Sequence, residues 1–205
     1  MVAIVSDFTK GFNAVLHPGA NTSTKMSVGQ ALGMYYRFSI IPAILFMILG
    51  AVLFSALGAL LGPVGAAIGG GVGAGIAIVY AILVFWIAIP IGALISAALY
   101  HIVGMYVSGF KSGYSATFTG VTYQMMTIVG VLWLAFIPVI GAIIVFVFEL
   151  FSIYVLCKAW SNQHKTSVGK AFLTWLVWLI IGIIITVLFM GAALSSLTAP
   201  TTPIA

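Results

Sequence analysis

Charged residues are scarce in this sequence. Only 4% of its 205 residues are Asp, Glu, Lys or Arg, whereas a soluble domain averages about 25%. Hydrophobic residues make up 63% of the chain, and the mean hydropathy is +1.31. A chain with so few polar groups cannot cover itself with a hydrated surface. The composition therefore excludes a soluble globular protein and indicates an integral membrane protein.

Residues that carry catalytic or metal-binding chemistry are equally sparse. The chain has two acidic residues, three histidines and one cysteine. Cys157 alone cannot form an internal disulfide, and a metal site with four protein ligands would have to gather them from across the whole fold. No span brings Ser, His and an acid together in a recognisable nucleophile and base pattern. We expect no metal ion, no cofactor and no enzyme activity.

Seven Lys and Arg residues outnumber the two acids and give a net charge of +5. A nucleic-acid site needs a basic stripe that neutralises several phosphates, but these cations lie singly between apolar segments. We therefore expect no nucleic-acid binding and attribute the cations to orientation in the bilayer. The first 37 residues show no cleavable apolar signal, so the N-terminus is expected to be retained.

Long apolar runs fill most of the remaining sequence. They continue for about 20 residues or more, as transmembrane helices do, and they lack the alternation of barrel strands. The predicted fold is an all-α, polytopic integral membrane protein built as a bundle of five transmembrane helices. The expected spans lie at about residues 38–61, 78–107, 119–136, 139–160 and 168–194.

The second of these runs contains Pro90 and leaves two alternatives. It is either one kinked helix or two shorter helices. With one helix there are five spans, and every Lys and Arg falls on the same side of the membrane as the N-terminus. With two helices the later four lysines move to the opposite side, against the tendency of cytoplasmic loops to hold the cations. We therefore predict five spans, with the N-terminus in and the C-terminus out.

Three of the segments outside the expected spans allow predictions of their own. Residues 1–37 form a cytoplasmic N-terminal segment, in which apolar residues at helical spacing over 8–18 predict an amphipathic helix on the membrane surface, ending near Pro18. Residues 62–77 are rich in glycine. They form either a loop or a helix-packing face, on which Gly65, Gly69 and Gly73 recur every four residues. Residues 195–205 are expected to be a short disordered tail.

Glu149 is the most unusual residue of the chain, because it lies near the middle of the fourth span. An ionised acid at that depth costs roughly 3 kcal/mol, so it should face the bundle interior with a partner or stay protonated. His101 is the nearest obvious ionisable candidate, and Tyr100, Tyr123 or Ser152 could also serve. The pair Glu149 and His101 is a candidate intramembrane polar site. Its role would be a proton or ion relay, or a structural hydrogen bond inside the bundle.

Two phrases in the sequence are nearly identical. KMSVGQAL at residues 25–32 and KTSVGKAF at residues 165–172 each precede a span that runs from inside to outside. We interpret them as helix-start signals, in which Ser27 and Ser167 cap free backbone N–H groups. KSGYSATF at residues 111–118 is a weaker variant around Ser115. The lysines at this face are candidate contacts to lipid headgroups: Lys111, Lys158, Lys165 and Lys170.

The stretch from residue 108 to 172 resembles the Yip1-domain family. The resemblance lies in a glycine-rich segment before the third span, with Gly109, Gly113, Tyr114, Thr117 and Phe118, in the IPVIG turn at residues 137–141, and in the phrase around His164, Ser167, Lys170 and Ala171. The resemblance implies a five-helix domain with its N-terminus inside. It implies a membrane protein without an established enzyme activity. Eukaryotic relatives bind Rab-type GTPases and have a long polar N-terminal domain that this sequence lacks, so we do not expect GTPase binding. The brief loops suggest a bacterial or archaeal member in the plasma membrane.

These observations leave two functions from different classes. The first is a non-catalytic membrane scaffold or accessory protein, as a small subunit of a larger membrane complex or as a membrane-organising protein. Its partners would be the lipid bilayer and the helices of other membrane proteins, or further copies of this chain. The alternative is a small transporter or channel that uses Glu149 and His101.

Overall fold

The computed structural model describes residues 9, 11–13 and 15–198, and all regular structure in these residues is helical. Five helical stretches are long and apolar enough to cross a membrane. The chain is therefore an all-α, multi-pass membrane protein, and the predicted number of spans is confirmed. The five stretches are Val28–Leu60, Gly62–Val107, Tyr114–Phe136, Ile140–His164 and Val168–Met190.

The short helix α2 (Pro18–Asn21) precedes the first span, which is helix α3 (Val28–Leu60). The second span joins α4 (Gly62–Ala67), the π-helix η1 (Ile68–Gly73), α5 (Ala74–Leu83), the π-helix η2 (Val84–Ala88) and α6 (Ile89–Val107). The third consists of α7 (Tyr114–Leu132) and the 3₁₀-helix η3 (Trp133–Phe136). Helices α8 (Ile140–His164) and α9 (Val168–Thr198) complete the chain.

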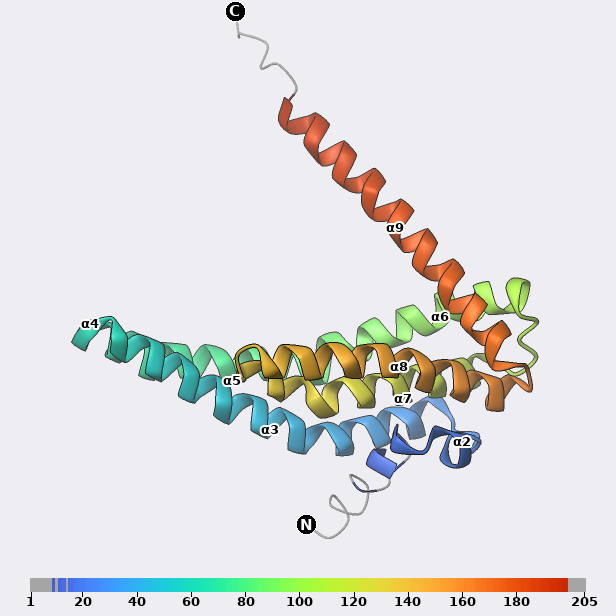
Figure 1. The fold of residues 1–205 in the computed structure, drawn as a ribbon, viewed down its shortest axis with the longest axis horizontal. Helices are drawn as coiled ribbons and strands as arrows, with labels where there is room; N and C mark the ends of the chain where they lie inside the picture. Colours follow the sequence, from blue (N-terminus) through green and yellow to red (C-terminus); the bar gives the residue numbers. More distant parts are fainter. Residues whose placement is uncertain (1–8, 10, 14, 199–205) are drawn as a thin grey trace, which may run out of the picture.

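Helix α7 is the centre of the bundle and packs against α3, α6 and α8. In its most apolar window, 56% of the residues are buried, compared with 6% for α9. Figure 1 shows the reason: α9 starts beside the ends of α6 and α8 and then diverges from the bundle. The hairpin formed by α3 and α4–α5 extends past α7 and α8, at the end of the bundle remote from the start of α9 (Figure 1). Much of the apolar surface of α9 and of this hairpin therefore has no protein neighbour within the described chain.

The largest fully buried side chain, Trp160 on α8, packs against α7. Its indole ring occupies the space that a Cβ on Gly120 would need, and its Nε1–H donates to the carbonyl oxygen of Thr117 at 3.0 Å. Tyr100 of α6 meets the same ring edge-on, with centroids 4.9 Å apart. The contact therefore unites three helices through one aromatic side chain.

The helix starts at the repeated phrases confirm the capping prediction. Ser27 Oγ accepts the N–H of Gln30 at 3.3 Å, and Gln30 Oε1 accepts the N–H of Ser27 at 2.9 Å, which is a capping box. Ser167 Oγ accepts the N–H of Lys170 at 3.2 Å. Because of the first cap, α3 begins at Val28, ten residues before the expected span. The weaker variant does not cap: α7 starts after Gly113, without a side-chain cap.

The glycine-rich segment is helical, which decides between the two alternatives for residues 62–77. Gly65 and Gly69 lie against α3 of the same chain. A Cβ at Gly69 would approach the carbonyl oxygen of Phe54 to 2.5 Å and the Cα of Gly58 to 2.7 Å. A Cβ at Gly73 would meet the Cβ of Phe54 at 3.0 Å. These small residues therefore allow the glycine-rich helices to approach the backbone of α3 closely.

Pro90 lies within a continuous helix, as predicted, and the structure explains how the helix accommodates it. Proline has no N–H, so it leaves a carbonyl of the preceding turn unpaired: Trp86 in α-helical register, or Phe85 in the π register of η2. Tyr35 Oη donates to the Phe85 carbonyl at 2.7 Å, and Tyr36 Oη donates to the Trp86 carbonyl at 3.3 Å. Two adjacent tyrosines of α3 thus satisfy the groups that the proline exposes.

The terminal segments differ in detail from the prediction. Residues 9, 11–13 and 15–16 are helical, but Val15 is buried in a cluster with Phe38 of α3 and Met126 of α7, so this face contacts the bundle. His17 is non-helical, and Pro18 opens the new helix α2 instead of only ending the first. Phe8 and Lys10 lie outside the described residues. Helix α9 continues to Thr198, past the predicted limit at 194, and the remainder of the tail, 199–205, also lies outside them.

Candidate functional site

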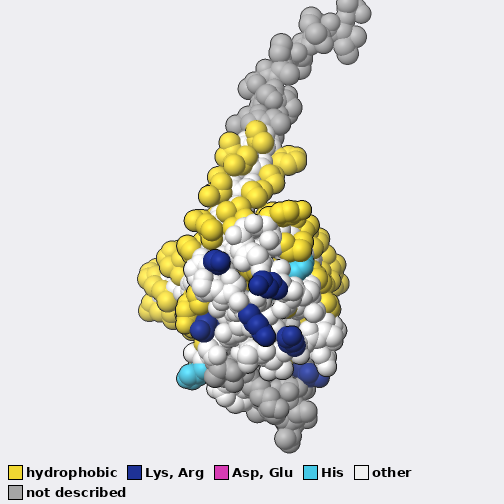
Figure 2. All heavy atoms as spheres, turned by 90° about the vertical axis from the view of Figure 1, so that its right-hand side faces the viewer, with side chains coloured by type: hydrophobic (Ala, Val, Ile, Leu, Met, Phe, Trp, Pro, Cys, Tyr) yellow, Lys and Arg dark blue, Asp and Glu magenta, His cyan; other side chains and the backbone are white. Residues whose placement is uncertain are grey.

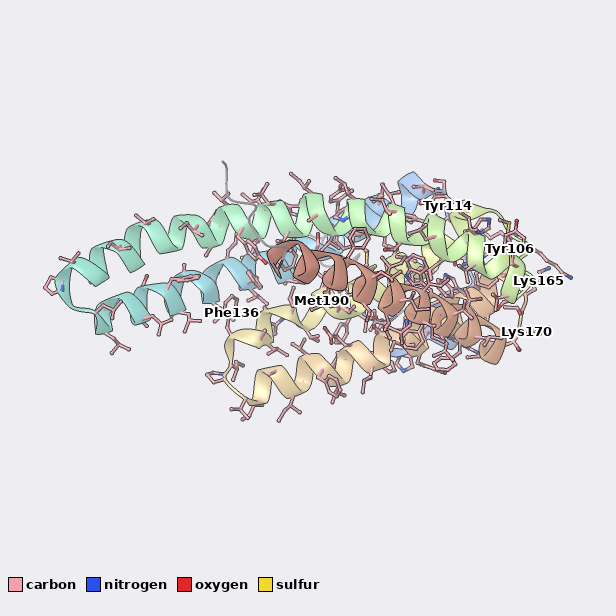
Figure 3. All side chains as sticks on the ribbon, turned by 90° about the horizontal axis from the view of Figure 1, so that it is seen from above. Tyr106, Tyr114, Phe136, Lys165, Lys170 and Met190 are labelled. Atoms are coloured by element: carbon pink, nitrogen blue, oxygen red, sulfur yellow. The ribbon has the colours of Figure 1, made fainter. Side chains whose placement is uncertain are left out.

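The cations of the described chain gather at one end of the bundle. They precede α3, occupy its first turns and the α6–α7 loop, and lie around the α8–α9 connection: Lys25, Arg37, Lys111, Lys158, Lys165 and Lys170. Figure 2 looks onto this end and shows several cationic side chains with no acidic one among its described atoms. In Figure 3, Lys165, Lys170 and Tyr106 lie at this end, whereas Phe136 lies toward the other. We call it the basic end.

A buried polar cluster lies just inside the basic end. Thr117 Oγ1 is 2.8 Å from His101 Nδ1 and 3.0 Å from His164 Nε2, so one hydroxyl joins α6, α7 and α8. Thr117 and His164 are 0% and 1% exposed. Phe110 stacks on the His164 ring at a centroid distance of 3.9 Å. We call His101, Thr117 and His164 the histidine–threonine cluster.

The hydrogen bonds of this cluster have a direction. The backbone N–H of Ser112 points to His164 Nδ1 at 3.3 Å, so this nitrogen is an acceptor. Neutral His164 then carries its proton on Nε2 and donates it to Thr117 Oγ1, whose own hydrogen donates to His101 Nδ1. Each ring nitrogen of His164 therefore has a partner, and the hydroxyl of Thr117 serves both as acceptor and as donor.

Two further sets of hydrogen bonds fasten flanking segments to the basic end. Gln163 Nε2 donates to the carbonyl oxygens of Thr22 and Thr24 at 2.7 and 2.9 Å, which attaches the segment before α3 to α8. Ser108, after α6, lies 2.6 Å from Thr174 Oγ1 and also donates to the carbonyl oxygen of Lys170. The start of α9 is thereby fixed, although the rest of the helix diverges.

The structure does not bring Glu149 and His101 together. His101 lies beside His164, with ring centroids 6.0 Å apart. Glu149 precedes His164 by fifteen residues of α8, or about 22 Å at helical rise. The expected pairing is therefore wrong, because the end of α6 is level with the end of α8 and not with its middle. The partner of His101 is Thr117, a residue that appears in the sequence only as part of a glycine-rich motif.

Glu149 faces outward instead. Its side chain is exposed, and the Glu149 carboxylate makes no hydrogen bond or ion pair with any residue that the structure describes. Exposed apolar side chains surround it on α8, among them Phe146 at 60% and Leu150 at 54% exposure. The alternative partners Tyr100 and Tyr123 do not reach it, and Ser152 donates to the backbone carbonyl of Glu149, not to its carboxylate. An acidic group thus lies on an otherwise apolar face.

The other candidate residues can now be placed. Gly65, Gly69 and Gly73 pack or lie near α3, as described above, so this face is occupied within the chain. Lys111, Lys165 and Lys170 are exposed at the basic end, and Lys158 is partly buried there. Among the described residues no three His, Cys, Asp or Glu side chains lie close enough to hold a metal ion. Cys157 is buried in the core.

Comparison with known proteins found no match: no family model, no curated protein and no solved structure matches the chain. Residues from the glycine-rich segment and from the phrase around His164 meet in space. Thr117 and His164 share a hydrogen bond, and Gly109 has a φ of +63°, which favours glycine, in the loop that carries Phe110 onto His164. The arrangement can position helices by hydrogen bonding.

Proposed function

We propose that this protein is a non-catalytic scaffold or accessory subunit that binds the helices of another membrane protein within the bilayer. The observation that supports this most directly is Glu149. An ionised acid exposed to lipid near the middle of a span costs roughly 3 kcal/mol. A neighbouring helix that offers a Lys, Arg, His or hydroxyl group to Glu149 would remove that cost. A protein helix is therefore a better neighbour for this face of α8 than lipid is.

The divergence of α9 supports the same proposal. Only 6% of the residues in its most apolar window are buried, and all of residues 183–190 are exposed within the described chain. A hydrogen bond between Thr174 and Ser108 holds the first turns of α9 against the bundle. The rest of the helix points away from it (Figure 1). A helix held in this way can contact a partner without losing its connection to its own bundle.

The proposed orientation places the basic end in the cytoplasm, because cytoplasmic loops hold the cations of multi-pass proteins. This puts the N-terminus inside and the C-terminus outside. The resemblance to the Yip1-domain family, which implies a five-helix N-in protein without an established enzyme activity, agrees with the proposal. Short loops favour a prokaryotic plasma membrane as its location.

Site-directed photo-crosslinking in the native membrane tests the proposal. A photoreactive residue at Phe146, one helical turn from Glu149, is compared with one at Ile95 on α6, which is similarly exposed at 57%. We expect a discrete protein adduct from position 146, lost in Glu149→Leu and retained in Glu149→Gln, which still hydrogen-bonds. An adduct of twice the mass of the chain would identify the partner as a second copy.

The same experiment has an outcome that would contradict the proposal. If position 146 yields only lipid adducts, and Glu149→Leu raises the thermal stability of the purified protein while changing no adduct, then Glu149 faces lipid. The accessory-subunit proposal would then be wrong.

A further inference from the structure

A pocket of about 320 Å³ opens at the basic end, between the segment before α3, the α6–α7 loop and the end of α8. Half of its lining is polar in character, unlike the apolar grooves along the spans. The residues that matter for its chemistry are Lys25, Lys111, Ser112, Gly113, Ser115 and Gln163. The pocket adjoins the histidine–threonine cluster at Ser112, whose N–H bonds His164, and it does not include Glu149.

The first wall of this pocket is the start of α7, a helix of 19 residues. Gly113 is its N-cap residue and has no side chain, so no hydrogen bond from a side chain caps this end. The N–H of Ala116 is paired with the carbonyl oxygen of Gly113, which leaves the N–H groups of Tyr114 and Ser115 without an intrahelical partner. A helix start of this kind favours a negatively charged group through its free donors and its dipole.

The second wall supplies an independent observation, a buried acceptor without a donor. Gln163 is 2% exposed, and its Oε1 accepts no hydrogen bond from any residue that the structure describes. The amide cannot simply be turned round, because its Nε2 already donates to the carbonyl oxygens of Thr22 and Thr24. An unpaired buried acceptor of this kind costs about 1–3 kcal/mol. Because Oε1 itself is covered, a pocket side chain must turn aside before the O–H or N–H donor of a ligand reaches this atom.

Two cations complete the pocket. Lys25 lies before α3, and Lys111 lies in the α6–α7 loop. Both are exposed, and both line the pocket. No acidic residue lines the pocket. Its chemistry therefore combines free N–H donors, two ammonium groups and one unpaired acceptor.

We propose that this pocket binds a phosphate group that also carries a hydrogen-bond donor. The phosphate oxygens would accept hydrogen bonds from the start of α7 and pair with Lys25 and Lys111, and the donor would bond Gln163 Oε1. A phospholipid headgroup with a hydroxyl and a free phosphate in its monoprotonated or diprotonated form share this chemistry. The position at the end of a membrane bundle lets either one reach the site.

The experiment measures lipid retention by native mass spectrometry of the intact chain in mild detergent, with phosphatidylglycerol or phosphatidylcholine added. We expect the wild type to retain phosphatidylglycerol, which has both a net negative charge and hydroxyl donors, in preference to phosphatidylcholine. Lys111→Gln should weaken that retention about fivefold. The matched control Lys165→Gln removes the same charge from an exposed lysine at the basic end that does not line the pocket, and should change it little.

Gly113→Asp provides a second variant with a different signature. A Cβ at Gly113 would meet nothing within 4 Å, so the side chain fits. Its carboxylate should cap the free N–H groups of α7 and exclude the phosphate. We expect lipid retention to fall to the level of phosphatidylcholine while the thermal midpoint of the protein stays the same or rises.

A second arm distinguishes the two sources. Lipid-depleted protein is titrated with inorganic phosphate, and its thermal midpoint is followed. A rise in the wild type that is absent in Gly113→Asp identifies free phosphate as an occupant; no rise, together with selective lipid retention, identifies the headgroup. Both results support the pocket. Equal retention and equal phosphate response in the wild type, Lys111→Gln and Gly113→Asp would overturn it, as would an equal loss in Lys111→Gln and Lys165→Gln.

Discussion

His101 and His164 lie with their ring centroids 6.0 Å apart, on either side of a single threonine hydroxyl. They come from α6 and α8, two helices that are separated in sequence by the whole of α7. The hydroxyl belongs to α7, so the two rings and the bridge couple three consecutive spans.

Replacing the bridge should destabilise the bundle. Thr117→Val keeps the shape of the side chain but leaves a nitrogen on each histidine without a partner, and we expect it to cost about 1–3 kcal/mol of unfolding free energy. Thr117→Ser keeps the hydroxyl and should cost clearly less. Unfolding in a detergent titration measures the difference. Thr186→Val is the control, since that hydroxyl bonds only its own helix at Gly182 O, 2.8 Å away; an equal cost at both positions would refute the bridge.

The direction of the hydrogen bonds in the cluster can be observed directly. Because the N–H of Ser112 points to His164 Nδ1, we expect His164 to be the tautomer with its proton on Nε2. Nitrogen NMR of the protein with labelled histidine distinguishes a protonated from an unprotonated ring nitrogen. A proton on Nδ1 of His164 would contradict the arrangement.

Tyr35 and Tyr36, which bond the backbone beside Pro90, should contribute unequally to the free energy of unfolding. Tyr35→Phe removes the donor to the Phe85 carbonyl in a fully buried place and should cost about 1 kcal/mol. Tyr36→Phe removes a longer bond at 38% exposure and should cost less. In a Pro90→Ala background, the new N–H can pair with the preceding turn, so the cost of Tyr35→Phe should shrink. A double-mutant cycle of unfolding free energies tests this coupling, and a cycle without interaction energy would argue against it.

The close approach between α3 and the glycine-rich helices predicts an asymmetry among neighbouring glycines. Gly69→Ala would push a methyl group against the Phe54 carbonyl and Gly58, and we expect a loss of about 1–3 kcal/mol. Gly71→Ala is the matched control, because a Cβ there meets nothing within 4 Å. It should be neutral or stabilising, since alanine favours helix over glycine. Thermal unfolding of both variants decides, and similar midpoints would mean that the two helices separate in solution.

The two serine caps should each contribute to stability. Ser27→Ala breaks the capping box and Ser167→Ala removes a single bond to the Lys170 N–H, and each should cost about 1 kcal/mol, the first somewhat more. Ser115→Ala is the control, because its hydroxyl makes no hydrogen bond with any described residue. A loss of partner binding at unchanged stability in Ser27→Ala and Ser167→Ala would instead identify the repeated phrase as a binding motif.

The sequence by itself determined the features that depend on local composition and on neighbours along the chain. The apolar runs predict five spans because each crossing requires about 20 apolar residues wherever its neighbours lie. The serines of the repeated phrase predict helix starts because a cap bonds N–H groups only two or three residues away. The single-side placement of the lysines also follows from span count alone.

Only the tertiary structure decided which side chains meet across helices. The position of Glu149 suggested an inward partner, and the structure places it on an apolar outer face; His101 pairs through Thr117 with His164 instead. The glycine face meets α3, and Tyr35 and Tyr36 complete the backbone around Pro90. Each of these pairings depends on the rotation of a helix about its axis and on its shift along its neighbour. In a span that is apolar all round, no periodic pattern in the sequence specifies either quantity.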